Sequence, residues 1–267
     1  MYITKTKKAF TLIELLVVIA IIALLLAILM PSLQIAKEKA AGVVCLSNLS
    51  NMSKAWYAYA SENDSEMVNG STGYSSFHWV NGSLTDSGTQ IAASSSEVEE
   101  KINGIKEGAL YPYLNDPKVY HCRGDKRSTK SPKKGGCGKG GYRSYSIPCG
   151  MNGGGWNGIP PLKKQTQLRS SDSKYIFVEE MDGRGYNMGG WAITSGSPAW
   201  VDPVAVWHND SSTLAFADGH AESHKWHGDK LIEMTENETF YSGVLTDADD
   251  IEDYEFMLKG FANKNNR

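Results

Sequence analysis

Several motifs of familiar enzyme classes are missing from this sequence. It has no Gly-x-Ser-x-Gly nucleophile motif, no His-Glu-x-x-His zinc motif and no phosphate-binding loop. Proteins that bind nucleic acid usually carry an excess of basic residues, whereas this chain has a formal net charge of −3. The four cysteines form no Cys-x-x-Cys pair, and this argues against a structural zinc site. The sequence therefore predicts a protein that is not an enzyme and does not bind nucleic acid.

Charge is also nearly absent from residues 10–30, where only Thr11 and Glu14 interrupt an apolar run. As a helix these 21 residues span about 31 Å, which matches the hydrocarbon thickness of a bilayer. Three lysines and no acid precede the run: Lys5, Lys7 and Lys8. This asymmetry favours a cytoplasmic N-terminus and an exported remainder. Because no small-x-small cut site follows the run, we expect a single-pass anchor and not an ordinary signal peptide.

Glu14 is the one charge inside the run, where an uncompensated carboxylate is costly. Residues 8–16, Lys-Ala-Phe-Thr-Leu-Ile-Glu-Leu-Leu, resemble the processing site of type IV prepilins and type II secretion pseudopilins. The resemblance implies that a prepilin peptidase cuts between Ala9 and Phe10 and that Phe10 is then N-methylated. The family usually has Gly before the cut. Ala9 is small enough that we still expect processing.

The same resemblance implies that Glu14 is an assembly residue. Cleavage would leave an amine on Phe10, one helical turn from Glu14 on the same face. Glu14 can compensate this amine within one chain or, as the family implies, in a neighbouring subunit. In a low-dielectric filament core such a pair sets axial register more than it adds net stability.

The helix is predicted to continue beyond the membrane. Pro31 removes a backbone donor, so we expect a kink or local melting there. Apolar residues then recur near a 3.6-residue period at Leu33, Ala36, Ala40, Val43, Val44, Leu49, Met52, Trp56 and Tyr59. We expect a removed basic leader at 1–9, a transmembrane or filament-core helix at 10–30, an amphipathic half of that helix at 31–64 and an exported head at 65–267. The predicted class is α+β, with a type IV pilin-like helix packed on an antiparallel sheet and extensive loops.

The head is predicted to be mostly loop over residues 69–108 and mostly strand in its C-terminal half. Residues 108–114 are expected to form a short turn or helix that leads to a strand at 118–122, and further strands are expected at 174–179, 190–194 and 204–208. A hairpin is predicted at 212–226, with Asp218 and Gly219 as a two-residue type I′ turn and Leu214 and Phe216 facing the core. In that register Ala215 would face Glu222.

His208, nine intervening residues and then Asp218-Gly219 resemble the His-x9-Asp-Gly signature of a subfamily of large prepilin-like proteins. A structural role is enough to explain these residues: Asp218 and Gly219 would form the turn, and His208 would end an adjoining strand. The alternative is a metal site, because His220, Glu222 and His224 share one predicted strand face, with His208 and His227 nearby. Three acids of residues 246–250 are a further candidate site, for Ca²⁺: Asp247, Asp249 and Asp250. We predict no cofactor, with Ca²⁺ as the alternative.

Disulfides can form on the exported side of a membrane. Cys122, Cys137 and Cys149 flank a Gly-rich loop, and we predict one bond among these three. Cys45 is expected to lie on the helix and to stay free.

The leading hypothesis is a structural subunit. It would be stored in the inner membrane with its head in the periplasm, and would polymerise with other pilin or pseudopilin subunits into a type II secretion pseudopilus or a type IV pilus. A second hypothesis is a binding module, a minor pilin or signal-anchored head that recognises a glycan or an exported substrate through Trp79, Trp156, Trp191 and Trp200. A third is a metal-dependent enzyme built on the histidines.

Overall fold

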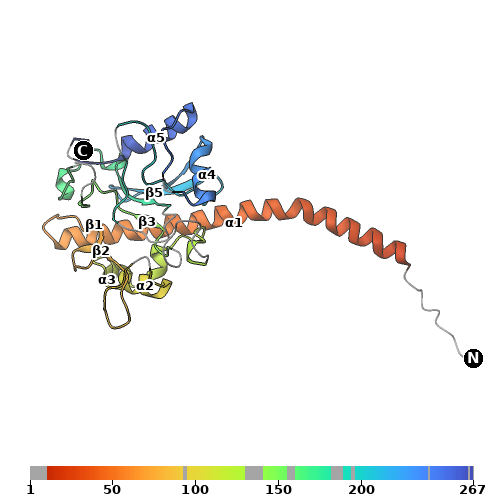
Figure 1. The fold of residues 1–267 in the computed structure, drawn as a ribbon, viewed down its shortest axis with the longest axis horizontal. Coiled ribbons are helices and arrows are strands. Elements are labelled where there is room, and N and C mark those ends of the chain that lie inside the picture. The colour runs from red at the N-terminus through yellow and green to blue at the C-terminus, as the bar shows by residue number, and fades with distance from the viewer. Residues whose placement is uncertain are drawn as a thin grey trace, which may run out of the picture.

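The chain forms one long helix with a head packed along its C-terminal half (Figure 1). The computed structural model describes residues 11–92, 95–129, 141–154, 160–181, 189–193, 196–239, 241–263 and 265–266. The head combines an antiparallel sheet with short helices on both sides of the long one. The predicted α+β arrangement, a long N-terminal helix packed on an antiparallel sheet, is therefore confirmed.

Helix α1 runs without interruption over Leu12–Glu62, a length of about 77 Å for its 51 residues. Thr11 caps its start, and Asn63 ends it with a side-chain amide that donates to the carbonyl of Tyr59. Pro31 lies inside the helix, which does not melt there. Instead the free half of α1 bends gradually (Figure 1).

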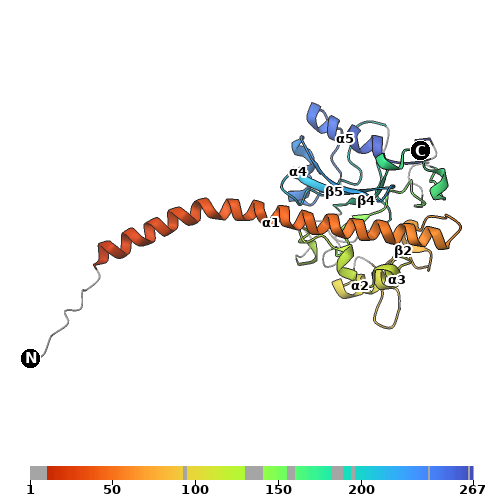
Figure 2. The same cartoon turned by 180° about the vertical axis from the view of Figure 1, so that it is seen from behind.

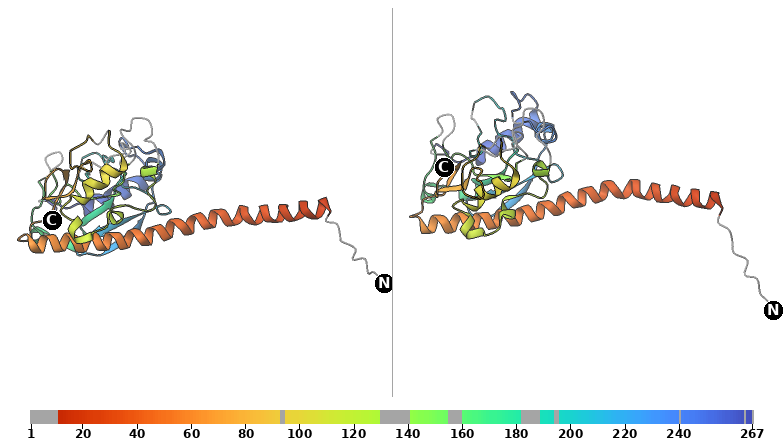
Figure 3. Two further views of the ribbon diagram at one scale, coloured as in Figure 1. Left: turned by 90° about the horizontal axis from the view of Figure 1, so that it is seen from below. Right: turned by 60° about the horizontal axis from the view of Figure 1, so that its bottom comes forward.

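Only the last part of α1 touches the head. Its buried residues begin at Gly42 and recur every three or four positions: Gly42, Cys45, Leu49, Met52, Ser53, Ala55, Trp56 and Ala60. Leu33 and Val43, which were predicted to face the head, are 55% and 68% exposed. The packed face thus starts more than two turns later than the sequence period suggested. Figure 3 shows α1 along one edge of the head, with its N-terminal half projecting away.

A four-stranded antiparallel sheet lies against α1, in the order β3-β4-β5-β6. The strands are β3 Tyr145–Ser146, β4 Tyr175–Glu179, β5 Ser211–Phe216 and β6 Ala221–Lys225. Helices α4 Asp229–Asn237 and α5 Ala248–Gly260 cover the other face (Figures 1 and 2). The sequence did not predict these two helices. Each begins with an acidic turn and buries only a short apolar stripe, so its helical period is weak.

Four short elements complete the head: β1 Asn69–Gly73, β2 His78–Asn81, α2 Val98–Lys106 and α3 Tyr111–Leu114. Two of them, α2 and α3, lie on the opposite side of α1 from α4 and α5 (Figure 2). The prediction of mostly loop over 69–108 holds for about half of the range, but it missed β1, β2 and α2, which cover 18 of its 40 residues. Strand β1 has the sequence Asn-Gly-Ser-Thr-Gly and carries no apolar period, so its pairing with β2 has no signal in the sequence.

Three predicted strands shrink to single contacts or turns. Residues 118–122 start within a 3₁₀ turn at Pro117–Tyr120. Trp191 makes one isolated bridge, to Pro148, and Val204 makes one, to Glu180. Thr194, the end of the predicted 190–194 strand, lies outside the described residues.

The sheet separates two hydrophobic cores. Ala215 and Ala217 belong to the cluster around α1, together with Leu49 and Trp56. Leu214 and Phe216 point the other way, into the cluster under α4 and α5, as predicted. Strand β5 is therefore buried on both faces.

The β5–β6 hairpin differs from its prediction by one residue. Ala215 pairs with Ala221 and Leu214 with Glu222, and the Phe216 N–H donates to the His220 carbonyl. Three residues, 217–219, then form the turn. Gly219 adopts a φ of +95°, whereas Asp218 is absent from the residues with positive φ, so the turn is not type I′. Positive φ at two successive residues occurs instead before β5, at Asn209 and Asp210.

Leu49→Ala tests the attachment of the helix to the head. Leu49 is fully buried, so we expect the free energy of unfolding of the full chain in detergent to fall by about 2–5 kcal/mol. Chemical denaturation followed by tryptophan fluorescence measures it. Lys54→Ala, on an exposed position of the same helix, is the control and should change the value by less than about 0.5 kcal/mol. Equal effects of the two substitutions would contradict the packing described here.

Gly219→Ala tests the turn after β5. A Cβ there meets only Tyr57, at 3.5 Å, so the cost arises from the positive φ and should be about 1–2 kcal/mol in the same assay. Gly196 has open space around it and no positive φ, which makes Gly196→Ala the matched control. A Gly219→Ala protein as stable as its Gly196→Ala counterpart would show that the turn has another geometry.

Candidate functional site

The N-terminal half of α1 exposes a continuous apolar surface. The side chains of its large apolar residues between Leu12 and Met30 are 46–79% exposed. Among the described residues, α1 is the one helix long and apolar enough to cross a membrane, and none of its most apolar window is buried in the head. A surface of this size and composition does not stay in water, so a membrane or other helices must cover it.

Glu14 caps the helix at the start of this surface. Its Oε2 accepts hydrogen bonds from the Thr11 backbone N–H at 2.8 Å and from the Thr11 hydroxyl at 2.7 Å. The Glu14 N–H in turn donates to the Thr11 Oγ1 at 3.3 Å, which completes a capping box. The predicted cut between Ala9 and Phe10 lies outside the described residues. The carboxylate is nevertheless held at the end of α1 where that cut would create the new amine.

His208 of the predicted signature lies where α1 meets the sheet. It is 4% exposed, and its Nε2 lies 2.9 Å from Glu179 Oε1 and 3.3 Å from Cys122 Sγ. Cys122 Sγ lies 3.0 Å from the Sγ of Cys45, on α1. One ligand atom from each of the four residues falls within 4.8 Å of all the others. We call these four residues the buried cluster.

Four separate segments bring the buried cluster together. Cys45 faces inward from α1, Glu179 ends β4, and His208 precedes the turn into β5. Cys122 follows the 3₁₀ turn at Pro117–Tyr120. No two of the four are close in sequence, so spacing carried no signal. Cys45 was expected to be free and Glu179 only to end a strand, so the cluster was not predicted.

The loop after Cys122 is braced by a buried ion pair. Arg127 Nη2 lies 2.7 Å from Asp125 Oδ2, and both residues are almost fully buried. The Ser144 hydroxyl donates to Asp125 Oδ2 at 2.7 Å and accepts the Cys122 N–H at 2.9 Å. This network fixes the backbone of Cys122 and therefore the position of its sulfur.

The pKa values in the buried cluster move apart. Burial raises the pKa of Cys122 and that of Glu179 above their ordinary ranges. Hydrogen bonding with Cys122 lowers the pKa of Cys45 to about 4. Burial lowers the pKa of His208, but its contacts with Cys45 and Glu179 outweigh this and raise it to about 10. These pKa shifts favour a protonated His208 beside a Cys45 thiolate, while Cys122 keeps its proton.

The residues predicted as alternative metal ligands make other contacts. His220 stacks on Phe216 and hydrogen-bonds Asp218, and His224 stacks on Phe256 with ring centroids 3.7 Å apart. Within the described ranges, the buried cluster is the one group of His, Cys and acidic residues spaced for a metal ion, and it includes neither His220 nor His224.

The acids predicted as a Ca²⁺ loop cap helices instead. The Asp247 carboxylate accepts the Asp249 N–H at 2.9 Å at the start of α5, and Asp250 accepts the N–H of Lys230 in α4 at 2.9 Å. Acids in the first turn of α5 also suit the helix dipole. These contacts engage the carboxylates of Asp247 and Asp250, and Ca²⁺ binding by the run stays a prediction.

The cysteines predicted to form a disulfide and the tryptophans predicted to bind a glycan are buried wherever the structure describes them. Cys149 is buried in the core under α4 and α5, in a different cluster from Cys122, and Cys137 lies outside the described residues. The nearest cysteine to Cys122 in the described chain is Cys45, which was not among the predicted partners. Trp79, Trp191 and Trp200 are at most 1% exposed and offer no surface to a sugar, while Trp156 lies outside the described residues.

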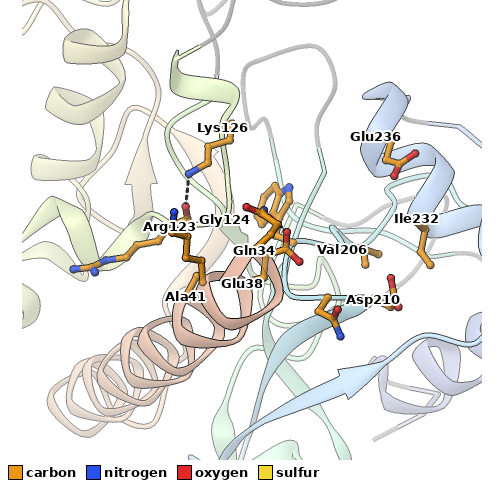
Figure 4. A pocket seen from close by; sticks show the side chains of 13 residues that line it. Gln34, Glu38, Ala41, Arg123, Gly124, Lys126, Val206, Asp210, Ile232 and Glu236 are labelled. Atoms are coloured by element: carbon orange, nitrogen blue, oxygen red, sulfur yellow. Dashed lines mark hydrogen bonds between the residues drawn. The ribbon is translucent and has the colours of Figure 1, made fainter. Parts of the chain in front are cut away.

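A pocket of about 560 Å³ lies beside the buried cluster, where α1 leaves the head (Figure 4). Glu38 and Gly124 belong to both neighbourhoods, because they line the pocket and hydrogen-bond to residues of the cluster. The other lining residues come from α1, the loop after Cys122, the turn before β5 and α4: Gln34, Lys37, Ala41, Arg123, Lys126, Val206, Trp207, Asn209, Asp210, Ile232 and Glu236.

Comparison with known protein families finds one match, at the N-terminus. The family model described as the prokaryotic N-terminal methylation motif matches residues 4–30. These residues include the lysines, Glu14 and the apolar run. A search of curated proteins and of solved structures gives no match. The motif, the single apolar N-terminal helix and the α+β fold together support a type IV pilin-like, membrane-anchored family for this chain.

Proposed function

We propose that this chain is a structural pilin-like subunit of a type II secretion pseudopilus or a type IV pilus. A prepilin peptidase removes residues 1–9, and Phe10 is then N-methylated. The helix holds the subunit in the inner membrane with its head in the periplasm until α1 packs against the helices of neighbouring subunits.

The observation that supports this most strongly is the match of residues 4–30 to the N-terminal methylation motif, on a helix whose free half is apolar on every side. A membrane span that packs inside its own protein would bury one face, whereas here none of the most apolar window is buried. A helix apolar all round fits lipid in one state and a bundle of like helices in the other. The buried residues of α1 begin at Gly42, and its Glu38 carbonyl contacts His208 of the head, which leaves about 25 residues at the start of α1 for those contacts.

Glu14 supports assembly through the helix ends. Its carboxylate already accepts hydrogen bonds at the first turn of α1, through Thr11. Removal of residues 1–9 would place a positive amine on Phe10, beside the same turn. In the membrane or in a filament core, that amine and Glu14 are each costly alone and acceptable together. Pairing between subunits would then fix how far one helix is displaced along the next.

Glu14→Val tests this role. Without the carboxylate the amine of Phe10 has no partner in the helix bundle, so the variant should be cut and stay in the membrane but largely disappear from sheared filaments. Immunoblots of the membrane and filament fractions from the native host measure both pools.

Lys39→Ala is the matched control, because Lys39 is an exposed charge on the same helix beyond the apolar run. It should assemble like the unsubstituted protein. Normal filament levels with Glu14→Val would rule out an assembly role for the carboxylate. Loss with both variants would mean that the assay reports damage to the helix in general.

A further inference from the structure

The head contains a buried group of side chains that assembly through α1 does not use. We propose that Cys45, Cys122, Glu179 and His208 bind a zinc ion. This site is independent of the proposed filament function, and it replaces the expectation that a chain without a Cys-x-x-Cys pair has no structural zinc.

The donor atoms and their spacing suit zinc. Two sulfurs, one imidazole nitrogen and one carboxylate oxygen are a tetrahedral set that Zn²⁺ accepts. Zinc bonds of about 2.0–2.3 Å place neighbouring ligand atoms roughly 3.3–3.8 Å apart. The contacts between Cys45 and Cys122, Cys122 and His208, and His208 and Glu179 are 3.0, 3.3 and 2.9 Å. An ion would therefore need only a small outward movement of side chains that already converge.

Three of the four ligands are oriented by hydrogen bonds with neighbouring groups, as ligands in metal sites usually are. His208 Nδ1 lies 3.3 Å from the backbone carbonyl of Glu38, which leaves Nε2 to face the cluster. Glu179 Oε2 accepts the Thr213 N–H at 2.7 Å, which leaves Oε1 facing inward.

Cys122 has the third such partner. Its Sγ accepts the Gly124 N–H at 3.2 Å, a bond that stabilises a thiolate. A Cβ on Gly124 would lie 2.7 Å from the side chain of Trp207, so the close approach of this backbone depends on glycine.

Charge gives the second argument. Cys45, Cys122 and Glu179 are 0% exposed and His208 is 4% exposed, so their charges must be compensated within the protein. Two thiolates, a carboxylate and a neutral imidazole together carry three negative charges, and Zn²⁺ neutralises two of them. In the metal-free arrangement His208 Nε2 faces Glu179 and Cys122, whereas Nδ1 faces the Glu38 carbonyl. Nε2 would bind the zinc ion, while Nδ1 stays directed at the Glu38 carbonyl.

Four protein ligands leave no open position for water or substrate, so the ion would be structural. It would join α1 to the end of β4 and to the turn before β5. The adjoining pocket, whose lining includes Glu38 and Gly124, provides an entry path from solvent. A disulfide between Cys45 and Cys122 is the competing chemistry. It would use neither the imidazole nor the carboxylate, nor the N–H bond to sulfur.

Zinc content of the full chain, purified in detergent without chelator or reductant, tests the proposal. Inductively coupled plasma mass spectrometry should find about one zinc ion per chain. Cys122→Ser and His208→Gln should lose most of it. Cys149→Ser is the matched control, because Cys149 is also buried but lies in the other core, and it should keep its zinc.

Cobalt keeps the test decisive even if the variants fold poorly. Co²⁺ added to the unsubstituted chain after zinc removal should give thiolate-to-cobalt charge-transfer absorption and the visible bands of a tetrahedral ion, and added zinc should abolish both. Substoichiometric zinc with no cobalt–thiolate absorption would overturn the proposal. So would a peptide map showing a Cys45–Cys122 disulfide in most of the protein. Loss of zinc with Cys149→Ser as well would show that the metal content follows general folding and not this site.

Discussion

Burial of one face of α1 between Gly42 and Ala60 sets the position of the rest of the head. The sheet lies against this face through the small residues Ala215 and Ala217, and Leu49 and Trp56 fill the space between them. Because β5 is buried on both faces, α4 and α5 can cover only the side that α1 leaves open. The same helix has no such partner over its first thirty residues, where every large apolar side chain is exposed. One continuous element thus holds the head together and presents the surface that must be covered elsewhere.

The buried cluster lies where these two parts of α1 meet. Gly42 brings the helix close enough that a Cβ there would lie 3.4 Å from the ring of His208, and Cys45 follows one turn later. A bond or ion at Cys45 would therefore act on the first turns of α1 that touch the head. Any force transmitted along the helix in an assembled filament would reach the sheet first through this region, since the buried residues of α1 begin at Gly42 and the Glu38 carbonyl already lies 3.3 Å from His208.

Long, strongly patterned features were predictable from the sequence. The span of α1, strand β4 and the β5–β6 hairpin follow from local periodicity and turn residues. These signals lie within short stretches of the sequence. The hairpin register failed by one residue, because Asp-Gly is compatible with a two-residue and a three-residue turn, and only packing against both cores selects the second. Strand β1 and helices α4 and α5 failed because their burial is decided by distant partners.

The buried cluster was not predictable for a related reason. Its members come from positions as far apart as Cys45 and His208, and each has an ordinary local explanation as a helix, loop or strand residue. Glu179 in particular ends an apolar strand, where a carboxylate normally turns toward solvent. Only the folded arrangement shows that it is fully buried and directed at an imidazole.

The intact mass of the protein isolated from its native membrane tests the central claim most directly. The proposed processing predicts a chain that begins at Phe10, lacks the nine residues Met1–Ala9 and carries one added methyl group on its new terminus. Fragmentation of the N-terminal peptide would locate that group. A mature protein that retains Met1–Ala9, or one cut at the far end of the apolar run, would contradict the assignment as a prepilin-like subunit.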